Sequence, residues 1–397
     1  MVHTGLSILV EDALGYGSVP AVPRGARVGL VCHGASVDQH LRYTFDLLAA
    51  AGYDLRFILA PEHGLFGDVP YMQRVEHSRL SHLGVPVVSL YGDSIEQLRP
   101  PPGLLDGIDC LVCDIQDVGS RYYTYIATMA ILMEVCSGTG IRFVVLDRPN
   151  PIGLDLVEGN IIPPTMRSFV GYMQLPARHA LTPGEAALHY RNVTGLDLDL
   201  QVVACRGLSR TMTWHDMDLP WIPPSPNIPT PETALVYTGM CLLEGTNLSE
   251  GRGTASPFFL AGAPFITDPW GLVAELNRAM LPGVAFRPVR FTPAFDKWAS
   301  KSCGGVHVVV TDEYEFKSLL TGMVLISTIA RLYAGQFSIR THAYEFVSDT
   351  PALDLLIGDR TTGKALVMGV DAMDLYNDLQ DRNHSWWDLA QDILLYR

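Results

Sequence analysis

Four strand-like runs in the first 150 residues each lead directly into acidic or histidine side chains. The runs and the residues that follow them are 26–31 with His33, 55–60 with Glu62 and His63, 109–113 with Asp114 and Asp117, and 142–146 with Asp147. The carboxyl ends of parallel strands share one edge of a sheet, and ligands bind along that edge in doubly wound folds. The sequence therefore predicts an acidic, histidine-containing cleft, which is typical of an enzyme.

The segments between these runs have the pattern of helices. Residues 43–50 read as a helix closed by Gly52, and residues 122–136 read as a helix that ends near Gly138. Glycine is favoured just after a helix because it adopts the left-handed conformation without strain. Strands that alternate with helices indicate βαβ units. We therefore predict an α/β fold with a Rossmann-like parallel sheet in its N-terminal part.

Thr182, Pro183 and Glu185 have the pattern of a helix start. Threonine at the N-cap with glutamate three residues later forms a capping box, and proline suits the first helical position. Glu185 therefore has two interpretations, a cap for this helix or a role in the cleft, and the pattern favours neither.

A proline-rich stretch at residues 220–229 divides the chain. Proline lacks a backbone N–H and fixes φ, so this stretch forms neither a helix nor a central strand. It is a linker or an ordered loop over the cleft, in which Trp221 is available to stack on a ligand. The elements predicted beyond it are helices at 270–280 and 315–333 and strands at 306–310 and 365–370.

The length of 397 residues exceeds what a single core usually supports. We therefore predict two domains: a Rossmann-like catalytic domain at 1–228, and a smaller α/β (α+β) domain at 229–397 that closes the cleft. The active site is expected in the cleft between them.

Composition restricts the possible partners. The formal net charge of −14 argues against nucleic acid, because binding to its backbone needs a cationic surface. No apolar run reaches the ~18 residues that a membrane span needs. No signal peptide is visible, and the 7 scattered cysteines fit a reducing compartment. We therefore expect a cytoplasmic protein, with the cell envelope as the alternative if an export signal has been removed.

Two further stretches concentrate polar groups. Residues 114–125 combine two acids, an amide, an arginine and three tyrosines where a strand meets a helix. Residues 245–254 place Glu250 and Arg252 among glycines, which let a backbone approach a ligand closely. These groups suit glycoside hydrolysis, which needs one protonated carboxyl as acid and a second group as base or nucleophile.

A metal site is the alternative interpretation of the same cleft. Nitrogen and oxygen ligands from His33, His63, Asp114 and Asp147 would suit Zn, Mn or Mg. However, no HExxH helix, dinucleotide fingerprint or P-loop occurs in the sequence. We therefore expect neither a metal nor an organic cofactor.

Seven stretches with recognisable motifs follow one another along the chain. They are PEHG at 61–64, SLYG at 89–92, DIQDVG at 114–119, RYYTY at 121–125, LDRPNP at 146–151, PSPN at 224–227 and NLSEGRGT at 247–254. In this order they resemble the signature motifs of the exo-β-N-acetylmuramidase (NamZ) family. The resemblance is strong over 24–264 and weaker beyond. Two segments depart from the family pattern. Where the family usually has asparagine after the first strand, this chain has Cys32 and His33, and where the family usually has His-Gly-Met-Thr, residues 179–182 read His-Ala-Leu-Thr.

The resemblance implies metal-free removal of N-acetylmuramic acid from the non-reducing end of peptidoglycan fragments, in cell-wall turnover and recycling. The implied partner is a saccharide or muropeptide, and Glu62 looks like the catalytic acid. The cleft residues carried over by motif are His63, Asp114, Gln116, Arg121, Tyr122, Glu250 and Arg252. We add His33, Asp117 and Asp147 from the sheet edge, and Asn227 and Asn247 from the matched motifs.

Within this site we assign catalysis to Glu62, His63 and Asp114. Asp114 is the first choice for the partner carboxylate and Glu250 the second. Arg252, or else Arg121, is expected to recognise the lactyl carboxylate of N-acetylmuramic acid, because the arginine fork grips a carboxylate with two bonds.

Two functions of other classes stay open at this point. One is a metal-dependent hydrolase of another ester or amide that uses the same cleft. The other is a non-catalytic protein that binds cell-wall sugars. A related glycosidase that acts on another β-linked N-acetyl sugar is a further variant.

Overall fold

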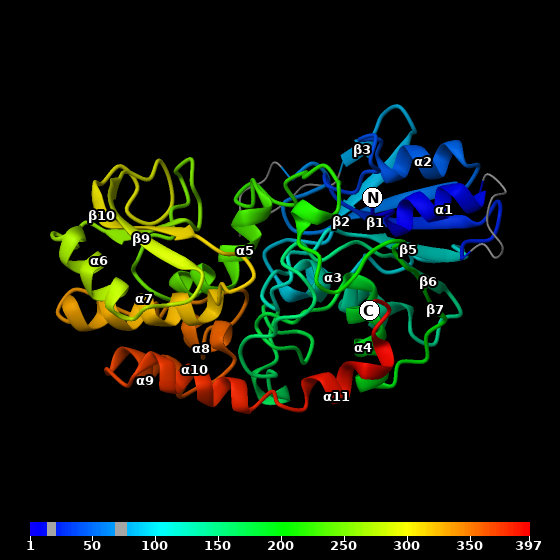
Figure 1. Ribbon diagram of the computed structural model, residues 1–397. Coiled ribbons are helices and arrows are strands. Elements are labelled where there is room, and N and C mark those ends of the chain that lie inside the picture. Colours follow the sequence, from blue (N-terminus) through cyan, green and yellow to red (C-terminus); the bar gives the residue numbers. More distant parts are fainter. Residues whose placement is uncertain (14–20, 68–77) are drawn as a thin grey trace.

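The computed structural model describes residues 1–13, 21–67 and 78–397 (Figure 1). The elements before the proline-rich stretch are α1 (Gly5–Ala13), β1 (Arg27–Cys32), α2 (Thr44–Ala50), β2 (Asp54–Ala60), β3 (Ser78–Leu80), β4 (Val85–Ser89), η1 (Ile95–Leu98), β5 (Cys110–Asp114), α3 (Tyr125–Cys136), β6 (Arg142–Leu146), η2 (Pro164–Met166), α4 (Pro183–Thr194), β7 (Leu200–Val203) and η3 (Trp214–Asp216). Those after it are α5 (Pro231–Met240), η4 (Cys241–Gly245), β8 (Leu260–Ala263), α6 (Pro269–Arg278), β9 (Val284–Phe291), β10 (Cys303–Val310), α7 (Ser318–Leu332), α8 (Ala352–Ile357), α9 (Thr362–Val367), α10 (Ala372–Asp381), α11 (Trp386–Ala390) and η5 (Gln391–Ile393).

The large sheet has the strand order β3-β4-β2-β1-β5-β6-β7. All neighbouring pairs are parallel except β3 with β4. This arrangement confirms the predicted Rossmann-like parallel sheet. The strand order reverses between β1 and β5, and such a switch point is where α/β folds bind their ligands.

Both faces of this sheet are buried, which explains the nearly continuous apolar runs of its strands. Side chains alternate along β1, so Val28 and Leu30 face a core shared with α1 and α2. Val31 faces the opposite core, which holds Met129 of α3 and Ala186 of α4. Figure 1 shows α1 and α2 on one side of the sheet and α3 and α4 on the other.

The smaller sheet is antiparallel, with the strand order β8-β10-β9. Helices α6 and α7 pack beside it (Figure 1). This second sheet confirms the prediction of a smaller mixed part after the proline-rich stretch. Within the described residues, no helix combines the length and apolar character that crossing a membrane requires.

Residues 365–370 differ from the prediction of a strand, because α9 covers residues 362–367. Short apolar runs do not distinguish a strand from a buried helix by pattern alone. Asp359 decides the outcome locally: its carboxylate accepts from the backbone N–H groups of Thr361 and Thr362 at 2.9 and 2.7 Å. These bonds satisfy donors that a helix start leaves unpaired. The prediction of a strand was therefore wrong.

Thr182 and Glu185 form the capping box that the sequence pattern indicates. Thr182 Oγ1 accepts from the N–H of Glu185 at 3.2 Å, and Glu185 Oε2 accepts from the N–H of Thr182 at 3.1 Å. The other oxygen of Glu185 pairs with Arg210 at 2.9 Å. The interpretation as a cap is therefore confirmed.

Buried contacts tie the C-terminal elements to the large sheet. Glu158 accepts from the N–H groups of Ser318 and Leu319, both at 3.0 Å, where α7 begins. The chain then returns at its end, where Tyr396 donates a hydrogen bond to Asp147 at the end of β6. The last residues thus pack beside β6 and α4 (Figure 1).

Asp147 supplies a pH-sensitive element of this contact. It is fully buried, and burial raises its pKa to about 7, although bonds from Tyr396, Gly184 and Thr182 oppose the shift. The folded protein therefore holds a proton on Asp147 between pH ~4 and ~7, where the unfolded chain has lost it. The contribution of this group to stability is present at low pH and is lost as pH rises through this window.

We expect wild-type stability to fall by roughly 1 kcal/mol per pH unit between pH 5 and 7, relative to Asp147→Asn. Urea unfolding midpoints of both proteins across this range measure the difference. Asp199→Asn is the control, because Asp199 is largely exposed and its pKa lies below its ordinary value. Parallel pH dependences for wild type and Asp147→Asn would contradict the assignment.

Candidate active site

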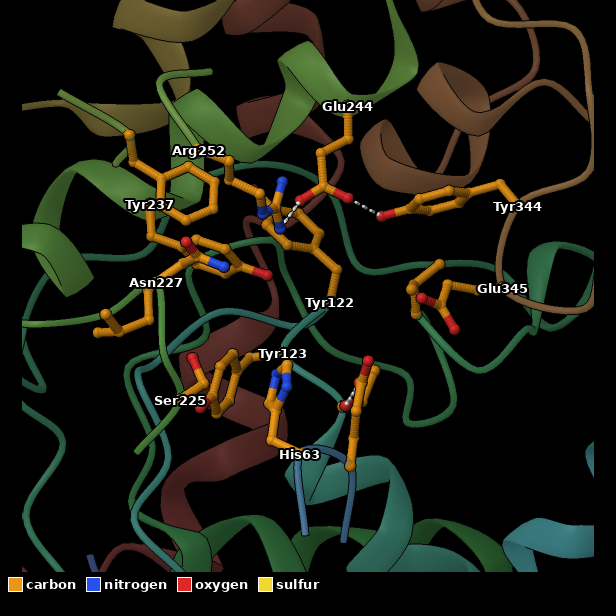
Figure 2. Close-up of a pocket in the computed structure, with 15 residues that line it drawn as sticks. His63, Tyr122, Tyr123, Ser225, Asn227, Tyr237, Glu244, Arg252, Tyr344 and Glu345 are labelled. Carbon is orange, nitrogen blue, oxygen red and sulfur yellow. Dashed lines mark hydrogen bonds and ion pairs between the residues drawn. The ribbon is translucent and has the colours of Figure 1, made fainter. Parts of the chain in front are cut away.

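A pocket lies where the carboxyl edge of the large sheet meets the C-terminal part of the chain (Figure 2). Its empty volume is about 480 Å³, part of which is open to solvent. The residues that line it are Glu62, His63, Tyr122, Tyr123, Thr124, Val170, Ser225, Asn227, Ile228, Tyr237, Glu244, Arg252, Phe258, Tyr344 and Glu345. Acidic and aromatic side chains dominate this lining.

Glu62 and His63 reach the pocket from a tight turn after β2. The N–H of Gly64 donates to the carbonyl of Pro61 at 3.1 Å, and His63 adopts a left-handed φ of 71°. Such a φ is uncommon for a residue other than glycine and often marks a functional site. Thr124, just before α3, donates to Glu62 Oε2 at 2.7 Å. Two elements next to the switch point thus fix the carboxyl of Glu62.

Arg252 enters the pocket together with two carboxylates. Its Nη1 donates to Glu250 Oε1 and its Nη2 to Glu244 Oε1, both at 2.6 Å. Lys297 Nζ lies 2.8 Å from the other oxygen of Glu250. Burial opposes the ionisation of Glu250, but the charges of Lys297 and Arg252 outweigh it and hold its pKa at about 2. Glu250 therefore orients Arg252 through an ion pair and is not itself a lining residue.

Tyr344 and Glu345 form a wall of the pocket that the sequence did not indicate (Figure 2). Tyr344 donates to Glu244 Oε2 at 2.8 Å, and Tyr91 donates to Glu345 Oε2 at 3.2 Å. Glu345 is buried, and burial together with the negative charges of Glu62 and Glu244 raises its pKa well above its usual value. The pocket thus holds a second carboxyl group that is electrostatically linked to Glu62.

Asp114 lies outside the pocket, at the end of β5. It is fully buried, and its two oxygens accept from Nε and Nη2 of Arg148 at 2.5 and 2.9 Å. Thr44 donates to it as well. A carboxylate fixed in this way neutralises a buried arginine and cannot also attack a sugar. The structure therefore does not bring Asp114 to Glu62 as a partner carboxylate.

His33, Gln116 and Asp117 form a hydrogen-bonded layer beneath the pocket. His33 Nε2 accepts from the N–H of Gln116 at 2.9 Å, and burial lowers the pKa of His33 well below its usual value. The Gln116 amide donates to the carbonyls of Asp117 and Pro149, both at 2.9 Å. Asp117 Oδ2 accepts from the N–H of Gly119 at 2.7 Å, as in a turn. Each of these polar groups is used by the fold, and none is a lining residue.

Arg121 is the largest departure from the predicted site. It is fully buried and donates to four carbonyls, those of Asn160, Leu175, Leu356 and Ile357, at 3.0, 3.0, 2.7 and 3.0 Å. Burial lowers its pKa to about 10. Its guanidinium therefore joins the loop between β5 and α3 to the end of α8. It does not line the pocket.

The remaining predicted residues divide between the pocket and its supports. Tyr122 and Asn227 line the pocket, and Tyr122 donates to the carbonyl of Thr238. Asn247 lies outside it and pairs with the segment that leads to Glu345, donating to the carbonyl of Gln336 at 2.8 Å and accepting from the N–H of Ser338 at 3.1 Å. Asp147 is committed to the C-terminal contact described above.

Several lining residues lay outside the predicted set. Thr124 and Ser225 belong to the motifs RYYTY and PSPN, so these stretches contained a usable signal. Tyr237, Glu244 and Phe258 lie within ten residues of the NLSEGRGT motif (247–254) in the sequence but outside it. Glu345 lies almost 100 residues beyond it with no motif around it, so only the tertiary structure reveals it. Trp221 packs on Trp214 at a ring distance of 4.9 Å and is not a lining residue.

Metal ligation finds no geometric support in the described part of the chain. No group of three or more histidine, cysteine, aspartate or glutamate side chains there is arranged to hold a metal ion. The histidines that the metal interpretation invoked are separated in function: His63 lines the pocket, whereas His33 lies buried against Gln116.

A parallel α/β sheet with an acidic, aromatic-lined pocket at its switch point defines a class of enzyme that acts on small polar ligands. Comparison of the sequence identifies the family. Residues 28–232 match exo-β-N-acetylmuramidase NamZ, N-terminal, and residues 235–396 match exo-β-N-acetylmuramidase NamZ, C-terminal. The chain therefore belongs to the NamZ family, as the sequence motifs predicted.

Relatives support this membership over the whole length. The peptidoglycan β-N-acetylmuramidase NamZ of Bacillus subtilis (strain 168) is 39% identical over 396 residues, which cover 100% of this chain and 91% of that protein. Two crystal structures of DUF1343 family proteins from Bacteroides fragilis NCTC 9343 have the same fold. One has a TM-score of 0.87 at 32% identity and the other a TM-score of 0.78 at 26%, each covering 100% of this chain and 99% of the other.

We expect Arg121→Met to destabilise the protein by about 3 kcal/mol, because it removes a donor from four buried carbonyls, of which that of Leu175 keeps a bond from the N–H of Ile162. Urea unfolding measures the loss. Arg142→Met is the matched control: its pair with Asp199 is about one-third to one-half exposed, so its loss costs under about 1 kcal/mol. Equal destabilisation by the two variants would show that Arg121 does not hold the parts together.

Proposed function

We propose that this chain is an exo-acting glycoside hydrolase that releases N-acetylmuramic acid from the non-reducing end of peptidoglycan fragments. Membership of the NamZ family, with a β-N-acetylmuramidase 39% identical over the full chain, is the observation that carries the proposal. The acidic pocket supports it, because glycoside hydrolysis depends on a pair of carboxyl groups. The cellular context is cell-wall turnover and recycling, with a saccharide or muropeptide as substrate.

Glu62 is the first catalytic carboxyl in this proposal, with His63 beside it. The support is its position at the sheet edge, its burial and the hydrogen bond from Thr124 that orients it. A carboxyl held in a single orientation can meet the glycosidic bond without further ordering.

The domains proposed for this function are 1–228, which carries the sheet edge, and 229–397, which closes the cleft. The pocket lining supports this division, since Glu62 and Tyr122 come from the first range and Arg252 and Glu345 from the second. Substrate then binds between the two.

Arg252 is the proposed ligand of the lactyl carboxylate that distinguishes N-acetylmuramic acid from N-acetylglucosamine. Its support is its place in the lining and its orientation by Glu244 and Glu250. A guanidinium whose rotamer is fixed by two carboxylates loses little freedom when it binds an anion.

The product of a defined disaccharide tests the function. A β-linked N-acetylmuramyl-N-acetylglucosamine should yield free N-acetylmuramic acid by mass spectrometry, whereas the reverse sequence should stay intact. Cleavage of the reverse disaccharide, or of neither, would overturn the proposal.

For Glu62→Gln we expect kcat/KM on this disaccharide to fall by ~10²–10⁴, because the variant retains the shape of Glu62 but cannot ionise or transfer a proton. A coupled assay for the released sugar measures the loss. Glu232→Gln, at the start of α5 and paired with the exposed His215, should retain wild-type activity. Near-normal turnover by Glu62→Gln would remove Glu62 from the chemistry.

For Arg252→Lys we expect the preference for muramyl over glucosaminyl glycosides to fall by roughly 10-fold or more. Lysine keeps the charge but loses the fork, and a charge-assisted bond contributes ~1.5–3 kcal/mol. The ratio of kcat/KM on matched aryl glycosides measures it. Lys297→Met should keep most of the preference, because Lys297 is not a lining residue and acts on the pocket through Glu250 and the carbonyls of Leu243 and Thr246. An unchanged ratio in Arg252→Lys would place lactyl recognition elsewhere.

A further inference from the structure

The carboxyl groups around the pocket differ in their partners. Glu244 is paired with Arg252, and Glu250 is paired with Arg252 and Lys297. Glu345 differs from both, since it forms no ion pair with any of the described residues. The hydroxyl of Tyr91 donates a hydrogen bond to Glu345 Oε2 at 3.2 Å. Burying a carboxylate without a cation costs free energy, so a carboxyl in such a place holds its proton more tightly.

We propose that Glu345 is a catalytic residue of this pocket: it donates a proton to the glycosidic oxygen, and Glu62 is its ionised partner. The proposal rests on the proposed function and assigns roles within it. It moves the proton-donor role, which the sequence resemblance gives to Glu62, to a residue of the C-terminal part.

The backbone around Glu345 is built to hold this side chain in place. Glu345 and Phe346 both have left-handed φ values, of 44° and 69°. Reciprocal hydrogen bonds of 2.9 Å between Tyr344 and Val347 close the turn around them. Strain of this kind persists where the surroundings determine it, and it gathers at active sites.

Both neighbours of Glu345 are anchored on other elements. The Tyr344 hydroxyl donates to Glu244 at 2.8 Å, and the ring of Phe346 lies 6.0 Å from Tyr91 and 5.9 Å from Phe169. The loop is therefore fastened to η4 and to the segment after β4, on both sides of the carboxyl. Fixed geometry of this kind is what a general acid requires.

The charges that face Glu345 favour its protonated form. Burial has the largest effect, followed by the carboxylates of Glu62 and Glu244, whereas Tyr91 and Arg340 oppose them. The result is a pKa well above that of an ordinary glutamate. Thr124 donates a hydrogen bond to Glu62 Oε2, which holds that carboxyl in one orientation. The proposal gives the proton to Glu345 and the negative charge to Glu62, which is the division of roles that glycosidases need.

The reaction balances with these two groups. As the bond from C1 to the leaving oxygen breaks, its electron pair stays on that oxygen, which takes the proton of Glu345. The positive charge that develops on the sugar ring faces the carboxylate of Glu62. Water then adds to C1 and gives a proton to the carboxylate of Glu345, which restores the starting state.

Two substrates with different leaving groups test the assignment. On the muramyl disaccharide, whose leaving alcohol needs a proton, Glu345→Gln should lower kcat/KM by ~10²–10⁴. On a 4-nitrophenyl muraminide, whose leaving group needs none, the loss should be under ~10-fold. Glu62→Gln should lower kcat/KM by a large factor on both substrates. The alkaline limb of the wild-type pH profile should disappear in Glu345→Gln, because the group whose deprotonation causes it is gone; loss of fold alone would not produce this change.

Asp354→Asn is the matched control. Asp354 is another buried carboxyl in the C-terminal part, and burial raises its pKa to about 6, but it is not a lining residue. This variant should keep both activities and the pH profile. Circular dichroism and urea unfolding of all variants check that each one folds.

The outcomes separate the two proposals. If wild type cleaves glucosaminides but not muraminides, the proposed specificity fails and the same comparison of variants on glucosaminides still decides the role of Glu345. Glu345 is not the proton donor if Glu345→Gln lowers kcat/KM by the same factor on both substrates, or does not lower it at all. The same conclusion holds if the loss of kcat/KM depends on the leaving group only in Glu62→Gln. No cleavage of either sugar overturns both proposals.

Discussion

The pocket exists because the buried guanidinium of Arg121 joins the two parts of the chain that form it. Arg121 lies between the sheet edge and α3, and two of its four carbonyl acceptors end α8 in the C-terminal part. Glu158 adds a second tie by capping the start of α7. Glu62 and Glu345 belong to the opposite sides of this junction, so their relative position depends on these buried bonds. The geometry of the site therefore depends on how the two parts dock.

Buried arginines also determine which carboxylates stay available for chemistry. Asp114 is consumed by Arg148, and Glu250 by Arg252 and Lys297. The acidic residues at the sheet edge are therefore mostly structural, although their sequence pattern is that of a catalytic cluster. Glu345 differs from them, because its surroundings in the pocket raise its affinity for a proton.

The sequence predicted the sheet and five of the fifteen lining residues, and the physical reason for that limit is locality. Apolar runs and helix caps act over a few residues, so the parallel sheet, the cap at Thr182 and the turn at Glu62 were all visible in the pattern. Which carboxylate is paired with which cation depends on contacts across more than 30 residues, as with Asp114 and Arg148. Arg121 shows the same limit, since its partners lie up to 236 residues away. The position of Glu345 in the pocket results from tertiary packing alone.

The charge balance of the pocket links recognition of the substrate to its cleavage. The described lining holds the carboxyls of Glu62, Glu244 and Glu345 and the guanidinium of Arg252. With the proton on Glu345, the proposed assignment leaves this set with one net negative charge. The lactyl carboxylate of N-acetylmuramic acid adds another, and a nearby negative charge strengthens the hold of a carboxyl group on its proton. A muramyl substrate therefore keeps the proposed acid protonated to higher pH than a glucosaminyl substrate does, so the group that distinguishes the two sugars also favours the catalytic state.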